Sequence, residues 1–382
     1  MQLTTACLEA GRPWTPAALS GLDSPETLLV LFGASGLIDA PDRINQVLDA
    51  CPRSHVLGCS TAGEIHGSEV SDESLVIAAL RFENTRVQTA QVAVHSPKDS
   101  YAAGASIAAQ LNAPALRGIL VLSDGLRVNG SELVKGLNDG LGGTVIVTGG
   151  LAGDGTSFKR TWVITERTPQ SGYVTAVGLY GDHVRIGQGS KGGWDQFGPT
   201  RLVTKSDGNV LYELDGRPAL QLYKDYLGDR ATGLPATGLL FPLALRGSWS
   251  NGKSLVRTVL AIDEATQSMT FAGDIPQGAF AQLMRADFDR LIQGASDAAE
   301  LTVHGFHSSH PALPTLSIAI SCVGRRLVLG ERTEEETEAT LDILPQGSRQ
   351  VGFYSYGEIS SCACGVCDLH NQTMTLTTIT EA

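Results

Sequence analysis

The chain has 382 residues, of which 42% are hydrophobic and 18% are charged, a balance typical of a chain that folds throughout its length. Its formal net charge of −12 disfavours contact with phosphate backbones and anionic membrane faces, so we expect neither nucleic acid nor a membrane surface as a partner. The amino terminus lacks a secretory signal pattern and no apolar run approaches the roughly 20 residues of a membrane span, so we expect a cytoplasmic protein without membrane insertion.

Strand and helix patterns alternate through the first half of the sequence. We predict strands over 26–32, 55–58, 118–122 and 144–148, and helices over 42–50, 101–111 and 131–141. Such alternation is typical of a partly parallel sheet. Two further β-branched segments, residues 74–82 and 87–94, flank a short polar turn and predict a hairpin.

The second half reads as another mixed α/β unit. We predict helices over 214–227 and 284–300, and strands over 255–262, 269–272, 315–321, 351–356 and 373–380. No fixed-period repeat is found, although the letters Gly-Glu-Ile recur at 63–65 and 357–359. Because 382 residues exceed what one core usually supports, we predict two intimately packed mixed-sheet domains, residues 26–217 and 218–382, in a layered α/β sandwich with a ligand cleft between them.

Two glycine-bearing segments, residues 58–65 and 149–155, follow predicted strands directly. Small residues at the carboxyl end of a strand let a ligand approach the backbone closely, and neighbouring polar side chains then supply directed contacts. A tight turn between layers is the alternative interpretation of each segment. The predicted contact residues are Cys59, Ser60, Thr61 and Glu64 in the first segment and Gly150 and Asp154 in the second.

A third motif lies near the carboxyl terminus, over residues 354–375. Tyr356 and Glu358 alternate along an extended segment, so both side chains are predicted to face one cavity. Asn371 and Thr373 are separated in the same way and are predicted to face it too. The three motifs are therefore expected to converge on one cleft.

Three cysteines and a histidine crowd into nine residues of this third motif. Cys362, Cys364, Cys367 and His370 carry the thiolate and imidazole groups that zinc selects, so a metal site is one prediction. A cluster of buried or redox-active thiols is the alternative, and the odd total of seven cysteines favours reduced thiols.

Two enzymatic patterns fail on context. Residues 247–254 match the phosphate-binding loop, but a strand pattern follows where such a loop leads into a helix, so we expect no bound nucleotide. No Gly-x-Ser-x-Gly elbow occurs, and Cys59 would need a neighbouring base to act as a nucleophile. We therefore predict no catalytic residues and a protein that is not an enzyme.

Five segments, residues 58–65, 149–154, 321–325, 352–359 and 370–377, together resemble the FIST family. The resemblance runs from about Glu26 to Glu381 and covers both the FIST N and the FIST C module. It implies a signal-transduction sensor that binds a small ligand, such as an amino acid, in a site built by both modules. Because no output module is present, the resemblance implies signalling through a separate partner.

For an amino-acid-like ligand, Glu64, Asp154 and Glu358 would suit the ammonium group and Arg325 the carboxylate. Some stand-alone members of the family resemble haem proteins that sense nitric oxide and regulate a histidine kinase, which is the first alternative. His370 is the one histidine within the motifs, so it is the candidate ligand for haem iron or for zinc. A zinc or thiol redox sensor that uses the carboxyl-terminal cysteines is the second alternative.

Overall fold

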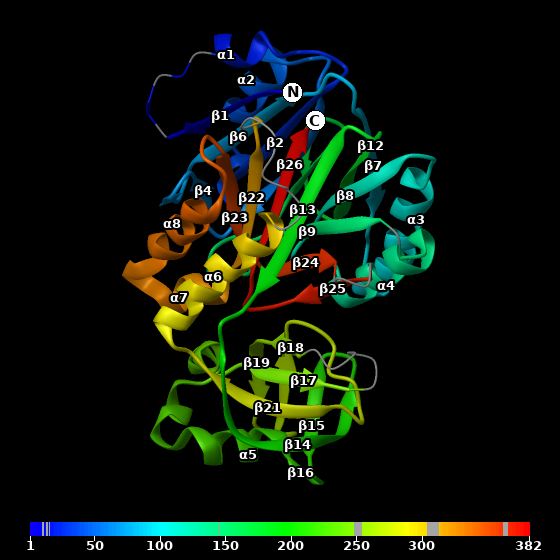
Figure 1. The fold of residues 1–382 in the computed structure, drawn as a ribbon. Coiled ribbons are helices and arrows are strands. Elements are labelled where there is room, and N and C mark those ends of the chain that lie inside the picture. The colour runs from blue at the N-terminus through cyan, green and yellow to red at the C-terminus, as the bar shows by residue number, and fades with distance from the viewer. Residues whose placement is uncertain are drawn as a thin grey trace.

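The protein is described by a computed structural model over residues 1–9, 11–12, 14, 16–143, 145–247, 254–303, 313–361 and 366–382. Three six-stranded sheets form a body, and an eight-stranded sheet forms a smaller unit beside it (Figure 1). The mixed α/β fold class is therefore confirmed. Among the described residues, no helix is both long enough and apolar enough to cross a membrane.

The three sheets of the body share one strand arrangement. The first sheet runs β1 (Gln2–Leu8), β6 (Leu75–Arg81), β2 (Thr27–Ala34), β3 (His55–Thr61), β10 (Val163–Thr165) and β11 (Thr168–Gln170). The second runs β7 (Arg86–Ala93), β12 (Tyr173–Tyr180), β8 (Leu116–Ser123), β9 (Ile146–Leu151), β24 (Gly357–Ser361) and β25 (Cys367–His370). The third runs β13 (Val184–Lys191), β26 (Met374–Glu381), β22 (Leu316–Cys322), β23 (Arg349–Ser355), β4 (Glu64–His66) and β5 (Glu69–Ser71).

In each sheet a parallel pair lies at the centre, and a hairpin from elsewhere in the chain completes one side. The hairpin β4–β5, which follows β3, joins the third sheet. The hairpin β10–β11 follows β9 and joins the first sheet, whereas β24–β25 follows β23 and joins the second. The body is thus built from three similar units that exchange hairpins in a cycle. The two Gly-Glu-Ile segments begin equivalent hairpins, at β4 and β24.

A glycine occupies the same place in the second parallel strand of every sheet. Gly58, Gly149 and Gly352 are each the fourth residue of β3, β9 and β23. A Cβ atom would lie 2.7 Å from a carbonyl oxygen of the neighbouring parallel strand at Gly58 and 1.8 Å from one at Gly149 and Gly352. Close packing between strand backbones therefore requires these motif glycines, independently of any ligand.

Helices cover the outer faces of the three sheets (Figure 1). The helices of the body are α1 (Ala17–Ser20), α2 (Asp42–Ala50), α3 (Ser100–Leu111), α4 (Gly130–Leu141), α6 (Phe288–Val303), α7 (Val323–Leu329) and α8 (Thr333–Ile343), with short 3₁₀ turns η1 (Ser35–Ile38), η2 (Pro97–Asp99) and η6 (Gly330–Arg332). The inner faces of the sheets meet in one apolar core that includes Val30, Leu120 and Ile318, one from each sheet. Within it, the rings of Phe32 and Phe353 are 4.7 Å apart.

The smaller unit is residues 195–285, inserted between β13 and α6. Its sheet runs β18 (Leu255–Arg257), β17 (Leu243–Arg246), β21 (Phe280–Arg285), β14 (Asp195–Asp207), β15 (Val210–Leu214), β20 (Ser268–Phe271) and β19 (Val259–Asp263), with β16 (Arg217–Pro218) paired to β15. Its helices are α5 (Ala219–Leu227), η3 (Gly228–Gly233) and η4 (Ala236–Leu240). The predicted boundary at 217/218 falls inside β16, and the division into two domains stays a prediction.

Three local predictions are corrected by the structure. The segments 74–82 and 87–94 do not form a hairpin, because β6 and β7 belong to different sheets and the carboxylate of Glu381 accepts the N–H groups of Glu83 and Asn84 between them. The predicted strand 255–262 is interrupted at Thr258. Residues 284–285 end strand β21, and the predicted helix begins only at Phe288. Within the phosphate-loop pattern, residues 248–253 lie outside the described chain.

Candidate functional site

A cavity of about 850 Å³ lies where the smaller unit meets the body. The body contributes residues 97, 125, 126, 128–130, 151, 156, 158, 322–324, 327, 356 and 371, whereas the smaller unit contributes residues 209, 233–236, 239, 258–260 and 271–273. This volume falls within the range of about 300–1,000 Å³ typical of small-molecule sites. The geometry therefore supports a ligand site between the two parts of the molecule.

The described walls of this cavity are largely apolar and carry no charge. Leu151 and Val323 line it from the body, and Leu239, Val259 and Phe271 line it from the smaller unit. Among the described lining residues there is no aspartate, glutamate, lysine, arginine or histidine. A charged ligand would thus lose its hydration without gaining an opposite charge, which disfavours it strongly.

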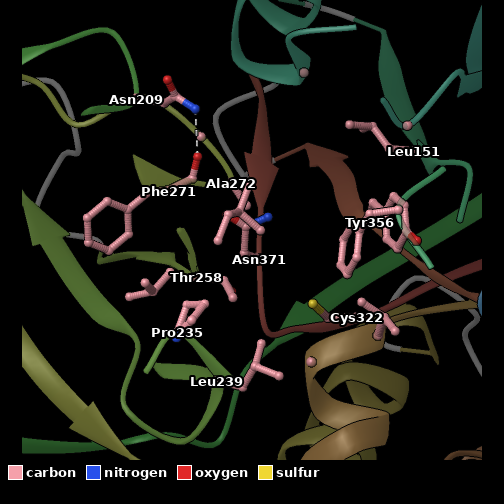
Figure 2. A pocket seen from close by; sticks show the side chains of 18 of the residues that line it. Leu151, Asn209, Pro235, Leu239, Thr258, Phe271, Ala272, Cys322, Tyr356 and Asn371 are labelled. Atoms are coloured by element: carbon pink, nitrogen blue, oxygen red, sulfur yellow. Dashed lines mark hydrogen bonds between the residues drawn. The ribbon is translucent and has the colours of Figure 1, made fainter. Parts of the chain in front are cut away.

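Two lining side chains carry polar groups that lack partners. Asn371 has no exposed surface, and neither its Oδ1 nor its Nδ2 forms a hydrogen bond with the described chain. Thr258 is 4% exposed, and its hydroxyl is likewise unpartnered within the described ranges. Figure 2 shows Asn371 between Thr258 and Ala272 of the smaller unit on one side and Tyr356 on the other. Each such buried group costs about 1–3 kcal/mol unless something binds it.

The turn between β25 and β26 fixes the position of Asn371. Its neighbour Gln372 has φ +63°, and the carbonyl oxygen of Gln372 accepts a hydrogen bond of 2.8 Å from the indole of Trp194. The Gln372 amide reaches across to the carbonyl oxygen of Leu239 at 3.4 Å. On the other side, Thr373 donates its N–H to Glu358 at 3.1 Å. Asn371 is therefore held by the two residues that follow it, although its own side chain makes no hydrogen bond with the described chain.

An aromatic pair borders the same cavity. Tyr356 stacks on Phe158 with ring centroids 4.6 Å apart and an angle of 12° between the planes. Asp154 accepts the hydroxyl of Tyr356 and the N–H of Phe158, the latter at 2.9 Å, so it positions both rings from behind the wall. Burial raises the pKa of the Tyr356 phenol, which keeps it protonated and able to donate. A Cβ at Gly125 would lie 1.8 Å from the carbonyl oxygen of Ala152 and 3.0 Å from the Tyr356 ring, so only glycine fits there.

The predicted glutamates lie in equivalent corners of the body and outside the cavity lining. Glu64 accepts the hydroxyl of Thr61 and both the N–H and the hydroxyl of Ser74, the latter two at 3.0 and 2.8 Å. Glu358 accepts hydrogen bonds from Ser355 at 2.6 Å and from the N–H and hydroxyl of Thr373 at 3.1 and 3.0 Å. Each carboxyl group fastens a hairpin to the start of the strand that returns after it.

Burial raises the carboxyl pKa of both Glu64 and Glu358. It raises the pKa of Glu64 to about 7 and that of Glu358 to about 8, although the surrounding donors favour ionisation. Neither group is placed to hold the ammonium group of a ligand in the cavity. Glu64, Asp154 and Glu358 do not line this cavity, and the oxygens of all three accept hydrogen bonds within the fold. Their convergence on one cleft stays a prediction without support from this site.

Arg325 is equally committed to the fold. It is fully buried and donates to Glu336 at 2.7 and 3.0 Å, to the carbonyl oxygen of Leu291 at 2.8 Å and to that of Gly192. Glu336 also accepts the hydroxyl of Tyr354 at 2.8 Å. This network ties α7 and α8 to the chain segments that enter and leave the smaller unit. Arg325 is not available to a ligand carboxylate.

The remaining predicted contact residues are also structural. The hydroxyl of Ser60 accepts the N–H of Trp162 at 3.0 Å, and Gly150 faces Glu358 in the β9–β24 pair. Cys59 is fully buried, and burial raises the pKa of its thiol well above the usual value, which disfavours the nucleophilic thiolate. Of the predicted contact residues, the cavity brings together Tyr356 and Asn371.

Sequence reasoning missed Thr258 and Phe158. Thr258 lies in the gap between two short strands that the apolar pattern merged into one, so no local signal marked it. Phe158 reaches the cavity because Asp154 accepts its N–H and fixes its loop. From the sequence, Asp154 itself was interpreted as the ligand contact, and Phe158 was therefore overlooked. Cys322 also lines the cavity, where burial raises its thiol pKa and leaves it neutral.

The predicted metal site falls partly outside the described residues, since Cys362 and Cys364 are not among them. Cys367 and His370 stand three positions apart in β25, so their side chains point to opposite faces of the strand. The Cys367 sulfur lies 3.2 Å from the side-chain oxygen of Asn138, and burial raises its pKa to about 12. The two described members of the set do not fit one shared metal ion.

Haem does not fit the described cavity lining. Its iron needs an axial ligand such as histidine, and its propionates are anions that need cations or exposure to water. The described lining offers neither histidine nor lysine nor arginine, and His370 is not part of it. The haem and nitric-oxide alternative therefore stays a prediction without support from this site.

Sequence relatives of the chain come from bacteria and an archaeon. An uncharacterized protein of Mycobacterium bovis is 26% identical over 357 residues, which cover 88% of this chain and 86% of the relative. One from Mycobacterium tuberculosis is 26% identical over 64% of this chain and 63% of its own length, so this chain spans less than two thirds of it. One from Methanocaldococcus jannaschii is 25% identical over 67% of this chain and 54% of its own length.

Among solved structures, a cyanuric acid hydrolase from A. caulinodans aligns over 99% of both chains, with a TM-score of 0.40 and 8% identity. Because this match is an enzyme, the prediction that the chain is not an enzyme is contradicted and is withdrawn. At this TM-score and identity, the match assigns no reaction, substrate or catalytic residue to the chain.

The family models match almost the whole chain. The FIST N domain model matches residues 27–217, and the FIST C domain model matches residues 219–361. Both matched segments contribute residues to the cavity lining. FIST domains are sensor domains of signal transduction. The five motifs and these two matches agree, and the chain belongs to the FIST family.

Proposed function

We propose that the protein is a sensor that binds a small, uncharged ligand in the cavity between the body and the smaller unit. The observation that carries this proposal is the pair of buried, unpartnered polar side chains, Asn371 and Thr258, in an apolar cavity of about 850 Å³. A buried polar group without a partner is rare in a folded protein and calls for an explanation such as a bound molecule. Membership of the FIST family supports the sensing role.

The ligand's lack of charge follows from the lining. The groups expected to hold an amino acid, Glu64, Glu358 and Arg325, are all engaged by neighbouring residues outside the cavity lining. An amino-acid zwitterion would bring two charges into walls that, as far as they are described, carry none. We therefore propose a neutral ligand in place of the amino acid expected from the family resemblance.

The signal is proposed to be a change in how the smaller unit sits on the body. The chain joins the two parts twice, over residues 191–195 and 285–288, and a ligand that touches both Asn371 and Thr258 ties them together. Trp194 in the first connection already bonds to the carbonyl of Gln372, next to Asn371. A separate signalling protein, for which a histidine kinase is the predicted class, would detect the altered arrangement.

A thermal unfolding screen of small molecules, both uncharged compounds and amino acids, tests this proposal. Ala236 is exposed and lines the cavity, so Ala236→Trp should block it, whereas Thr232→Trp on η3 is a matched exposed control outside the lining. We expect molecules that raise the unfolding temperature of the wild type and of Thr232→Trp but not of Ala236→Trp. Ligands that stabilise all three proteins equally, or a screen that yields charged amino acids alone, would contradict the proposal.

A further inference from the structure

The cavity presents one edge at which a hydrogen-bond donor and an acceptor stand side by side. In the planar carboxamide of Asn371, the Nδ2 hydrogens and Oδ1 project in one plane, and both are unpartnered within the described chain. A ligand that offers the same two groups in reverse order, an N–H next to a C=O, forms two parallel hydrogen bonds with it. This match holds whichever way the carboxamide is turned, since exchanging its oxygen and nitrogen only reverses the ligand.

Space and shape next to this edge suit a flat group. Glycines at 125, 273 and 324 leave parts of the wall without side chains. The stacked rings of Phe158 and Tyr356 border the same cavity and offer an aromatic face.

Thr258 supplies a third polar contact from the opposite part of the molecule. Its hydroxyl can donate or accept, and it is buried and unpartnered among the described residues. In Figure 2 its side chain and that of Asn371 approach the same space from the smaller unit and from the body. A ligand with a polar atom beyond its N–H and C=O pair can therefore be held at both ends.

We propose that the cavity selects an uncharged ligand with a planar cis-amide edge, as in lactams, cyclic imides and pyrimidinones, which pairs with Asn371 and reaches Thr258. This inference rests on the proposed function and narrows it to one ligand chemistry. Three probes represent the three sources of that chemistry: 2-piperidone, glutarimide and uracil. Each has an N-methylated counterpart of nearly the same shape that lacks the N–H.

Isothermal titration calorimetry on the full chain compares each probe with its counterpart. We expect at least one probe to bind and its N-methylated form, N-methyl-2-piperidone, N-methylglutarimide or 1,3-dimethyluracil, to bind at least tenfold more weakly. The probe that binds identifies which of the three sources fits. Binding of both members of a pair with equal affinity, or no binding by any of the three probes, would overturn the proposal.

Variants locate the interaction. Asn371→Leu keeps the volume but removes both hydrogen bonds, so probe affinity should fall at least tenfold. Thr258→Val should weaken binding about threefold to tenfold, whereas Thr232→Val, an exposed threonine of η3 outside the lining, should leave it unchanged. Thermal unfolding of each variant confirms that it is folded before binding is compared.

The same set separates this inference from the function on which it rests. If Ala236→Trp abolishes binding and Asn371→Leu does not, the cavity is the ligand site and the amide-edge proposal is wrong. If Ala236→Trp leaves binding unchanged, the ligand binds elsewhere and both are wrong.

Discussion

Glu358 and Asn371 are two buried polar side chains at neighbouring places in the fold, yet their surroundings are opposite. Glu358, on β24, accepts three hydrogen bonds from Ser355 and Thr373. Asn371, just past the paired strand β25, makes none within the described chain. Burial is the same for both, since neither side chain has exposed surface.

The difference shows that a buried polar side chain can have one of two roles, stabilising the fold or binding a ligand. A group whose partners are all internal holds the chain together, as Glu358 and its counterpart Glu64 do at equivalent corners. A group whose partners are missing costs stability until something external supplies them. By this comparison, Glu64 and Glu358 have a structural role, whereas Asn371 and Thr258 form the proposed binding surface.

The largest change in stability is expected when Glu358 is replaced. Glu358→Ala removes the acceptor of three buried donors, so the free energy of unfolding should fall by about 3 kcal/mol or more. Chemical denaturation with urea measures it, and Glu64→Ala, at the equivalent corner, should give a similar loss. A loss below about 1 kcal/mol at both positions would show that the corners are not structural.

The corners also predict a pH dependence. Folding raises the carboxyl pKa from 4.5 to about 8 at Glu358 and to about 7 at Glu64, so the folded chain keeps protons that the unfolded chain has lost. Stability should therefore fall as pH rises from about 4.5 to about 8, by up to about 1.4 kcal/mol per pH unit for each group. Urea unfolding at several pH values tests this, and Glu358→Gln, which mimics the protonated form, should flatten the slope above pH 7.

Asn371 is expected to respond with the opposite sign. Asn371→Leu replaces an unpartnered carboxamide by an apolar group of similar volume, so the ligand-free protein should gain about 1–2 kcal/mol in free energy of unfolding. The same urea measurement applies. A loss of stability would mean that the carboxamide has a partner within the protein, and the comparison with Glu358 would fail.

Thr258 should give the smallest change. Thr258→Val removes an unpartnered buried hydroxyl and should stabilise the ligand-free protein by about 0.5–1 kcal/mol. Thr232 is the matched control, because its hydroxyl is exposed and already bonds to the carbonyl of Asp229 at 3.0 Å. If the two valine substitutions change the unfolding temperature equally, Thr258 is not part of the binding surface.

The strand and helix periods predict the mixed α/β body well, because its central strands are apolar runs and its helices have regular spacing. The exchange of hairpins between sheets leaves no such local trace. Segments 74–82 and 87–94 resemble a hairpin in every local respect, and it is the distant Glu381 that holds the turn between strands of two sheets. Pairing decided by residues far apart in the chain is not visible in a local pattern.

The candidate site was harder to predict than the fold. Polar residues next to glycines, such as Ser60, Thr61 and Glu64, have the composition of a ligand loop, but the same groups satisfy the backbone where a hairpin leaves its sheet. Asn371 was predicted because it alternates with Thr373 in the polar motif near the carboxyl terminus. Thr258 could not be, since its part in the cavity depends on how an inserted unit packs against the body.

A crystal structure of the protein with the best-binding cis-amide probe tests the central claim most directly. We predict difference density for the probe in the cavity between the body and the smaller unit, with its N–H and C=O within hydrogen-bond distance of Asn371. Density for a saturating probe at any other place, with the Asn371 carboxamide still unpartnered, would contradict the claim.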